Sequence, residues 1–201
     1  MKRSGILFFS MAALLLLTGC GINVLNTQGV RVGVDPAPLG YEVDDDGAIS
    51  ITSHQLVLNS RKGAMGATVQ GYRAYFFDEF GDPVKAHDST TYSEGSLNVY
   101  VPAGIRCDNP DEELGCTVNS AGVRYAEGPT VLSQPVFLMP GGVALAMEQA
   151  ATFEVDEEGN IVGFDYPVGW HVELELYGED DNGRDFVTDR FRMDLQVPLG
   201  G

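Results

Sequence analysis

The side chains that could carry out catalysis or bind a metal ion are few in this sequence and far apart. The three histidines, His54, His87 and His171, are scattered along 201 residues. His171 and Glu173 share one face of an expected strand, but two ligands do not make a metal site. The sequence contains no G-x-S-x-G elbow, H-E-x-x-H, phosphate-binding loop or dinucleotide fingerprint. We therefore expect no catalytic residue, no metal site and no cofactor.

Acidic residues gather beside glycines at three places that are typical of turns. The three clusters are Glu42–Gly47, Asp156–Gly159 and Glu179–Gly183. Calcium prefers such oxygen-rich turns. When Gly47 is aligned with the invariant glycine of a calcium loop, however, Ser53 stands where the closing Glu is required, and Glu42 replaces the first Asp. Acids and glycine also favour exposed turns without any ion, which is the interpretation that we prefer.

Several aromatic side chains could offer a stacking surface for sugar rings. They are Tyr72, Tyr75, Tyr100, Tyr166, Tyr177 and Trp170. Aromatic residues at strand spacing more often lie in a core or pair across strands. Carbohydrate binding is therefore kept as an alternative function.

The first 20 residues have the order of a bacterial export signal. Lys2 and Arg3 precede an apolar run from Ile6 to Leu17, which is too short for an ordinary membrane-spanning helix. The run ends in Leu17-Thr18-Gly19-Cys20, which resembles the lipobox of bacterial lipoproteins. That resemblance implies cleavage after residue 19 and a diacylglyceryl thioether on Cys20, with acyl chains such as palmitate.

The resemblance further implies a protein of the cell envelope that is held to a bacterial membrane by its lipid. In lipoproteins of bacteria with two membranes, an Asp after the Cys often means retention at the inner membrane. Gly21 stands there, which favours the outer membrane. The alternative is an ordinary secretory signal with a chance Cys20, since signal cleavage requires only small residues.

The net charge also limits the possible partners. The whole chain has a formal charge of −17, and removal of residues 1–19 leaves 10 bases against 29 acids, or −19. A protein this acidic is repelled by phosphate backbones, so we expect no nucleic-acid partner. The lipid, and not charge, must hold the protein to an anionic membrane.

Cys107 and Cys116 remain once Cys20 carries the lipid. The eight residues between them include Asn-Pro and Leu-Gly, which are turn signals, so the chain can double back. Exported proteins can keep disulfides. A metal site is the alternative, but C-x₈-C without a neighbouring His or Cys lacks zinc-ligand spacing. We predict a disulfide between Cys107 and Cys116.

Alternating apolar residues between Gly/Pro turns predict many short strands in the rest of the chain. We expect strands at Val30–Val34, within Ile49–Ser60 (one or two), and at Thr68–Phe77, Leu97–Val101, Val131–Leu138 and Val143–Met147. No stretch shows a sustained 3.6-residue apolar period, so no helix is expected.

The last hairpin is the clearest element. Asn182-Gly183 is a favoured turn sequence between two alternating strands. The pleat predicts a buried face that holds Trp170, Val172, Leu174 and Leu176, with Phe191, Met193 and Leu195 from the returning strand. It predicts an outer face that holds His171, Glu173, Glu175, Arg190 and Arg192.

These elements predict an all-β fold, an antiparallel β-sandwich. The run from Ser53 to Val84 is similar in pattern to the early strands of bacterial immunoglobulin-like and fibronectin type III-like domains, and the last hairpin to their closing strands. That resemblance implies an immunoglobulin-like sandwich. It departs from antibody domains because Trp170 follows both Cys107 and Cys116.

We divide the chain into a signal peptide at 1–19, a lipidated tether at 20–29 and one enlarged sandwich at 30–198, with the disulfide pinning a loop insertion. The leading function is a non-catalytic envelope lipoprotein that acts as a structural or protein-interaction module. Its partners would be the membrane, through the lipid, and another envelope protein, through loops or an exposed strand edge. The alternative is a ligand-binding lipoprotein for carbohydrate or calcium.

Overall fold

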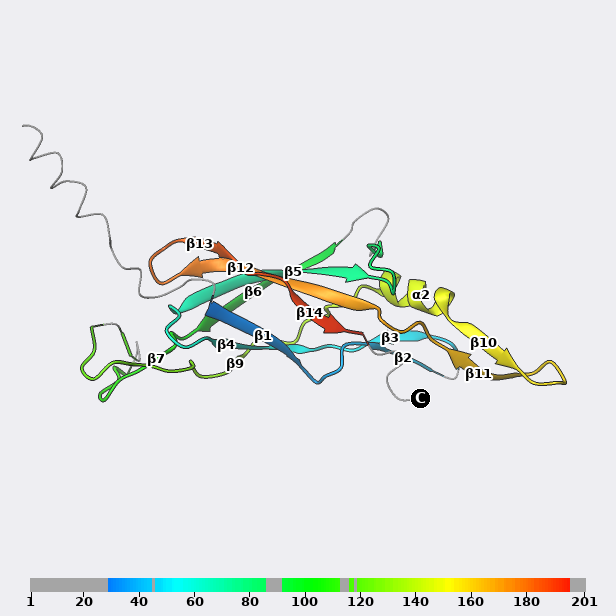
Figure 1. Ribbon diagram of the computed structural model, residues 1–201, viewed down its shortest axis with the longest axis horizontal. Helices are drawn as coiled ribbons and strands as arrows, with labels where there is room; N and C mark the ends of the chain where they lie inside the picture. Colours follow the sequence, from blue (N-terminus) through cyan, green and yellow to red (C-terminus); the bar gives the residue numbers. More distant parts are fainter. Residues whose placement is uncertain (1–28, 45, 86–91, 113–115, 118, 196–201) are drawn as a thin grey trace, which may run out of the picture.

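Two packed antiparallel sheets form the body of the protein (Figure 1). The computed structural model describes residues 29–44, 46–85, 92–112, 116–117 and 119–195. The larger sheet has the strand order β13-β12-β5-β6, and β14 also pairs with β12. Its strands are β5 (Ala67–Phe77), β6 (Tyr92–Val101), β12 (His171–Asp180), β13 (Asp185–Val187) and β14 (Phe191–Asp194).

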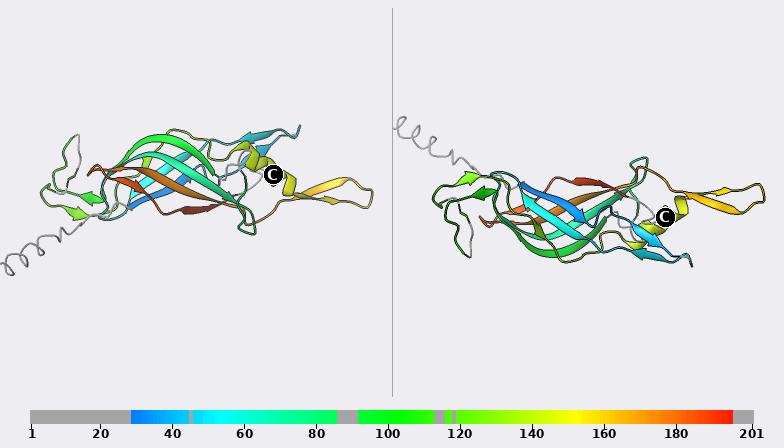
Figure 2. Two further views of the ribbon diagram at one scale, coloured as in Figure 1. Left: turned by 90° about the horizontal axis from the view of Figure 1, so that it is seen from above. Right: turned by 90° about the horizontal axis from the view of Figure 1, so that it is seen from below.

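The smaller sheet has the order β1-β4-β9 and lies against the inner face of the larger one (Figure 2). Its strands are β1 (Val30–Asp35), β4 (Gln55–Ser60) and β9 (Val131–Leu132). Leu56 and Leu58 of β4 belong to the same buried core as Phe76 of β5 and Leu174 of β12. The predicted all-β sandwich with antiparallel sheets is confirmed. Its immunoglobulin-like character stays a prediction.

Further elements extend the sandwich at both ends. The end that we call the disulfide pole carries the two-stranded pair β7 (Ile105–Arg106) and β8 (Arg124–Tyr125). The opposite end, the hairpin pole, carries a helix and two hairpins (Figures 1 and 2). These are α2 (Gly141–Ala150), β2 (Tyr41–Val43) with β3 (Ile49–Ile51), and β10 (Thr152–Val155) with β11 (Ile161–Asp165).

The predicted disulfide joins Cys107 to Cys116, with the two Cα atoms 5.6 Å apart. It closes a loop at the disulfide pole next to β7. In the chain-entropy model, closing so short a loop stabilises the folded state by about 2.5–3 kcal/mol. The turn after β4 links this loop to the start of the described chain. The Arg61 amide donates to the Gly29 carbonyl, and the Gly63 amide donates to the Gly104 carbonyl just before β7. The disulfide loop and Gly29 therefore lie at the same end of the sandwich.

The region predicted as a strand at Val143–Met147 is helical, and the expectation of an all-strand chain is wrong there. Helix α2 follows Pro140 and buries Val143, Ala144 and Met147. Val143 and Met147 are four residues apart, which places them on one helix face as readily as on one strand face. Alanine-rich composition favours the helix, and the short segment is less than three turns long, so its period was easily missed.

The predicted strand at Val131–Leu138 is also shorter than expected. It contributes only β9 and one isolated bridge, between His54 and Val136. Pro135 has no N–H to donate to a ladder. The stretch Ile49–Ser60, by contrast, divides into β3 and β4, which is one of the two outcomes that the pattern allowed.

The closing hairpin has the predicted faces. Trp170, Val172, Leu174 and Leu176 are all buried. On β14, Met193 lies opposite Val172, and Phe191 lies opposite Leu174. Met193 and Leu195 pack against the core from partly buried positions. Opposite residues of an antiparallel pair point to one side of the sheet, so both strands turn their apolar face inward.

His171 is buried, although it was predicted on the exposed outer face of the sheet. It lies on the outer side of the pleat but is only 7% exposed. Its ring stacks on Phe77 at 5.1 Å between centroids, because Phe77 lies directly opposite it on β5. Its Nδ1 lies 3.2 Å from the Gly169 carbonyl oxygen. The ring is thus covered by a side chain of β5, and the alternation of residues along β12 alone cannot predict which side chain of a neighbouring strand lies beside it.

The facing of β12 can be tested by two substitutions at adjacent residues. Leu174→Ala should cost about 2–5 kcal/mol of unfolding free energy, because it truncates a fully buried side chain. Glu173→Ala should cost well under about 1 kcal/mol, because it removes only a partly exposed ion pair with Arg190. Chemical unfolding of both variants measures this. A larger loss for Glu173→Ala would mean that the two faces are reversed.

Candidate interaction surface

The histidines and cysteines do not form a reactive cluster. His54 is buried near β4, its Nδ1 lies 2.7 Å from the Pro36 carbonyl oxygen, and its Nε2 has no hydrogen-bond partner. His171 lies in the stack on Phe77. Cys107 and Cys116 are joined to each other. His87 and Cys20 lie outside the described residues. In the described part of the chain, no three His, Cys, Asp or Glu side chains are grouped as metal ligands.

The aromatic residues considered for sugar stacking do not share one platform. Tyr72 and Trp170 are buried. On the outer face of the larger sheet, the Arg190 guanidinium lies over the Tyr75 ring at 3.8 Å, and that of Arg73 over the Tyr177 ring at 5.0 Å. These two rings are therefore already covered by cations.

The same outer face carries cross-strand ion pairs. Arg73 Nη1 lies 3.1 Å from Glu175 Oε1, and Arg190 Nη1 lies 3.0 Å from Glu173 Oε2. These pairs raise the pKa of both arginines. Glu173 and Arg190, both predicted on the outer face, thus lie there and form an ion pair. Partly exposed pairs of this kind contribute about 1 kcal/mol or less each, and they describe a solvated sheet face rather than a binding site.

The acid–glycine clusters are accounted for by one repeated turn. Four hairpin loops begin with an Asp whose carboxylate accepts backbone N–H groups of the loop: Asp44–Ala48, Asp78–Asp82, Asp156–Asn160 and Asp180–Arg184. The glycine at the fourth position has a φ between 71° and 84° in every loop, a conformation that glycine adopts without strain. The leading carboxylates therefore hold turns. The sequence pattern Asp-x-x-Gly would also have identified the fourth member, Asp78–Asp82.

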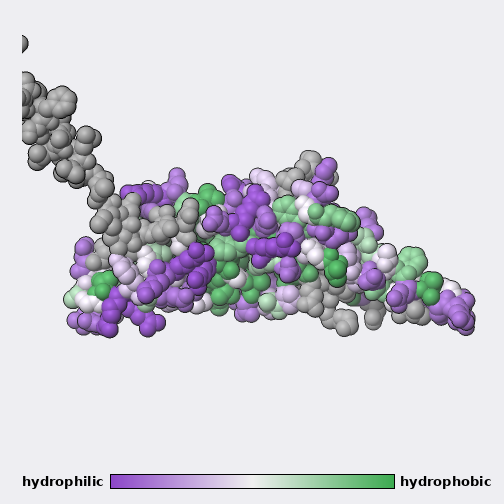
Figure 3. Space-filling view, in the orientation of Figure 1, coloured by the Kyte–Doolittle hydropathy of each residue, from purple (hydrophilic) through white to green (hydrophobic). Residues whose placement is uncertain are grey.

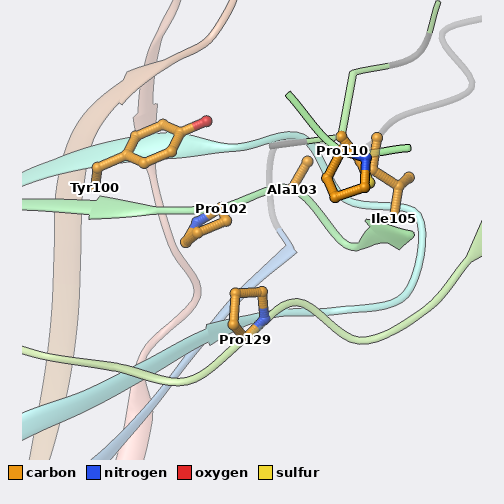
Figure 4. A pocket seen from close by; sticks show the side chains of 7 residues that line it. Tyr100, Pro102, Ala103, Ile105, Pro110 and Pro129 are labelled. Atoms are coloured by element: carbon orange, nitrogen blue, oxygen red, sulfur yellow. The ribbon is translucent and has the colours of Figure 1, made fainter. Parts of the chain in front are cut away.

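An apolar pocket of about 270 Å³ lies at the disulfide pole (Figure 4). It is lined by Tyr100, Pro102, Ala103, Ile105, Pro110, Cys116 and Pro129. The Tyr100 hydroxyl lies 3.4 Å from Asp181 Oδ2, and burial together with this carboxylate raises the pKa of Tyr100. Its phenol is therefore neutral at physiological pH. The lining offers an apolar surface and neither a nucleophile nor a general base.

The β10–β11 hairpin carries three of the exposed large apolar side chains, and it projects from the hairpin pole (Figures 1 and 2). All four residues of β10 are exposed. Phe153 on β10 lies directly opposite Phe164 on β11, and these rings are 63% and 60% exposed. Val155 is 55% exposed. Green apolar patches between purple polar ones mark this end in Figure 3. Exposed apolar groups of this kind on a projecting ribbon are typical of an interaction surface.

A partly buried carboxylate contact ties both legs of this hairpin to the sandwich. Glu148 lies near the end of α2, just before β10, and Tyr166 follows β11. The Tyr41 hydroxyl donates to Glu148 Oε1 at 2.6 Å, and the Tyr166 hydroxyl to Oε2 at 3.4 Å. Burial and the Glu148 carboxylate raise the pKa of Tyr41 well above its usual value, so its hydroxyl stays a donor. The hairpin therefore leaves the body at a point fixed by β2.

The hairpin is also strongly acidic. The chain has no Lys or Arg from residue 125 to residue 183. The hairpin itself carries Glu154, Asp156, Glu157, Glu158 and Asp165. Hydrogen bonds from the Asn160 side chain and then from backbone amides hold the pKa of Asp156 below its usual value. The projecting element is thus anionic around its exposed phenylalanines at neutral pH.

Comparison with known proteins adds no family. No protein-family model matches the chain, and no curated protein matches it significantly. In the described residues, no helix has the length and apolar character needed to cross a bilayer.

The sequence pattern predicted the turn at Asp156–Asn160 but not the exposed hairpin around it. The exposure of Phe153 and Phe164 depends on how far the hairpin extends from the body.

We expect Glu148→Ala to loosen the base of the hairpin. The substitution leaves the hydroxyl of fully buried Tyr41 without its acceptor, which should cost about 1–3 kcal/mol of unfolding free energy. Glu154→Ala is the matched control, because this exposed carboxylate lies on the hairpin itself and should change stability by about 0.5 kcal/mol or less. Denaturant unfolding and amide exchange at residues 152–165 measure both. Equal stability of the two variants would contradict the role of Glu148.

Proposed function

We propose that this protein is a non-catalytic lipoprotein of the bacterial cell envelope, anchored by lipid at Cys20, whose sandwich binds another envelope protein at the β10–β11 hairpin. The observation that carries the proposal is the pair of exposed phenylalanines on a projecting hairpin. A two-stranded hairpin is at best marginally stable in water on its own, and burial of a Phe is worth about 1.5–3 kcal/mol. A partner that covers this hairpin would both stabilise its two strands and bury its exposed phenylalanine rings.

The placement of the two poles supports the same function. Gly29 lies nine positions after Cys20, and an extended chain spans at most about 3.6 Å per residue, or about 32 Å. A lipid on Cys20 would thus keep the disulfide pole close to the membrane. The ten residues of β12 span about 33 Å along the sandwich and end beside that pole, where the Asp181 carboxylate contacts the Tyr100 hydroxyl. The hairpin would then lie at the end far from the membrane, where a second protein can reach it.

The ligand-binding alternative has less support. The aromatic residues do not form one platform, and the leading aspartates of the acidic turns already hold backbone amides. The pocket at the disulfide pole is lined by prolines and aliphatic groups with Tyr100 as its aromatic member. A sugar site would need polar groups that converge beside an aromatic face.

The lipid anchor is tested by mass. Intact-mass analysis of the membrane fraction should show a chain that begins at Cys20 and carries added diacylglyceryl and acyl mass. Cys20→Ala should abolish this mass and leave an unprocessed or mislocalised precursor. The Cys107→Ala/Cys116→Ala double variant should keep the lipid, since these residues pair with each other. A mature chain without added lipid mass would rule out the anchor.

The docking site is tested by substitution of the two exposed rings. Phe153→Ser/Phe164→Ser should lose the envelope protein that co-isolates with the wild-type chain, by about 2 kcal/mol or more of binding free energy, or about thirtyfold. Phe80→Ser, at a ring that is 83% exposed in another turn, should keep it. Thermal unfolding should show all three chains folded, because the substituted rings are exposed. Retention of the partner by the double variant would contradict this docking site.

A further inference from the structure

The β10–β11 ribbon has two unlike faces, which restricts what can bind it. Phe153 and Phe164 are opposite each other, so both point to one side. Glu154 and Asp165 are one residue further along their strands, so they point to the other side. One face is therefore aromatic and the other carboxylate. A strand placed beside this ribbon would meet apolar and anionic neighbours at alternate residues.

The ribbon also has open edges. In the described part of the chain, β10 pairs only with β11, and β11 only with β10. The outer edge of each strand therefore presents backbone N–H and C=O groups that no further strand takes up. Addition of an extended segment at such an edge is a recurrent mode of peptide recognition, in which backbone hydrogen bonds give affinity and alternate side chains give specificity.

The negative charge of the hairpin limits which kinds of partner could bind at such an edge. A second copy of this chain would bring five more carboxylates against the five of the hairpin, and like charges across a ladder are unfavourable. An anionic lipid surface would be repelled in the same way. A cationic segment would be attracted, and residues 125–183 hold no Lys or Arg that could neutralise these carboxylates from within the segment.

We propose that the partner contributes an extended segment that adds as a strand to an outer edge of the β10–β11 hairpin, with apolar side chains toward Phe153 and Phe164 and Lys or Arg side chains toward Glu154 and Asp165. This inference rests on the proposed function and names the chemistry of its partner. The segment has a two-residue alternation of apolar and basic residues, because the pleat of the ribbon has that period.

Three labelled peptides of eight residues test the proposal against the full-length protein by fluorescence anisotropy. One alternates Val and Lys, the second alternates Val and Glu, and the third has four Val followed by four Lys. The alternating Val-Lys peptide should bind at least tenfold more tightly than either of the others. Amide exchange should slow along β10 or β11 when it binds, because strand addition protects edge amides.

Variants separate recognition from general attraction between opposite charges. Phe153→Ala/Phe164→Ala should weaken the Val-Lys peptide at least tenfold, and Phe80→Ala, the matched exposed ring, should leave its affinity unchanged. Glu154→Lys/Asp165→Lys should reverse the preference toward the Val-Glu peptide. Circular dichroism and thermal unfolding confirm that each variant is folded. Equal binding of the block and alternating Lys peptides, or no effect of the phenylalanine substitutions, would overturn strand addition.

The outcomes also distinguish this inference from the proposed function. If Phe153→Ser/Phe164→Ser loses the co-isolated envelope protein but the Val-Lys peptide binds no better than the Val-Glu peptide, the hairpin is the docking site and the inference about its partner is wrong. If that double variant keeps the envelope protein, the proposed docking site itself is wrong. Peptide binding with the predicted order, together with loss of the envelope protein, supports both.

Discussion

The pleat of β12 is the constraint on which the rest of the structure depends. Its even-numbered apolar residues are buried between the two sheets, while Glu173 and Glu175 face outward to Arg190 and Arg73. Because β12 pairs with β5 on one side and with β13 and β14 on the other, its register fixes three neighbours at once. A slip of β12 by one residue would turn Glu173 and Glu175 toward the core. The stable sandwich that results allows the ends of the molecule to carry exposed elements.

The two ends differ in how they are held. At the disulfide pole, a covalent bond between Cys107 and Cys116 limits the loop. At the hairpin pole, a carboxylate shared by Tyr41 and Tyr166 fixes the base of the ribbon, and its tip extends away from the core. Exposed phenylalanines are costly to leave in water. Their place on the ribbon, surrounded by carboxylates, is understandable if a partner covers them, and this is the reason to regard the hairpin as the functional end.

Sequence periodicity predicted the sandwich because strands with one buried face alternate strictly, as Trp170 to Leu176 do. It failed where the helical and strand periods predict the same buried residues. Val143 and Met147 fit one face of a short helix and one face of a short strand equally well, so only tertiary packing determines which of the two forms. It also failed at His171, which is covered by Phe77 from a distant strand. The acid–glycine turns were recognisable from sequence, but the exposure of Phe153 and Phe164 was not. Whether an apolar side chain is core or surface depends on what the rest of the chain places over it.

The most direct test of the central claim is photo-cross-linking in living cells from single positions on the two poles. A photoreactive phenylalanine analogue would replace Phe164 at the hairpin pole or Tyr125, which is 49% exposed, at the disulfide pole. We predict a discrete cross-link to one envelope protein from position 164 and none to that protein from position 125. A cross-link to the same protein from position 125 alone, or none from position 164 in correctly anchored protein, would contradict a docking function for the β10–β11 hairpin.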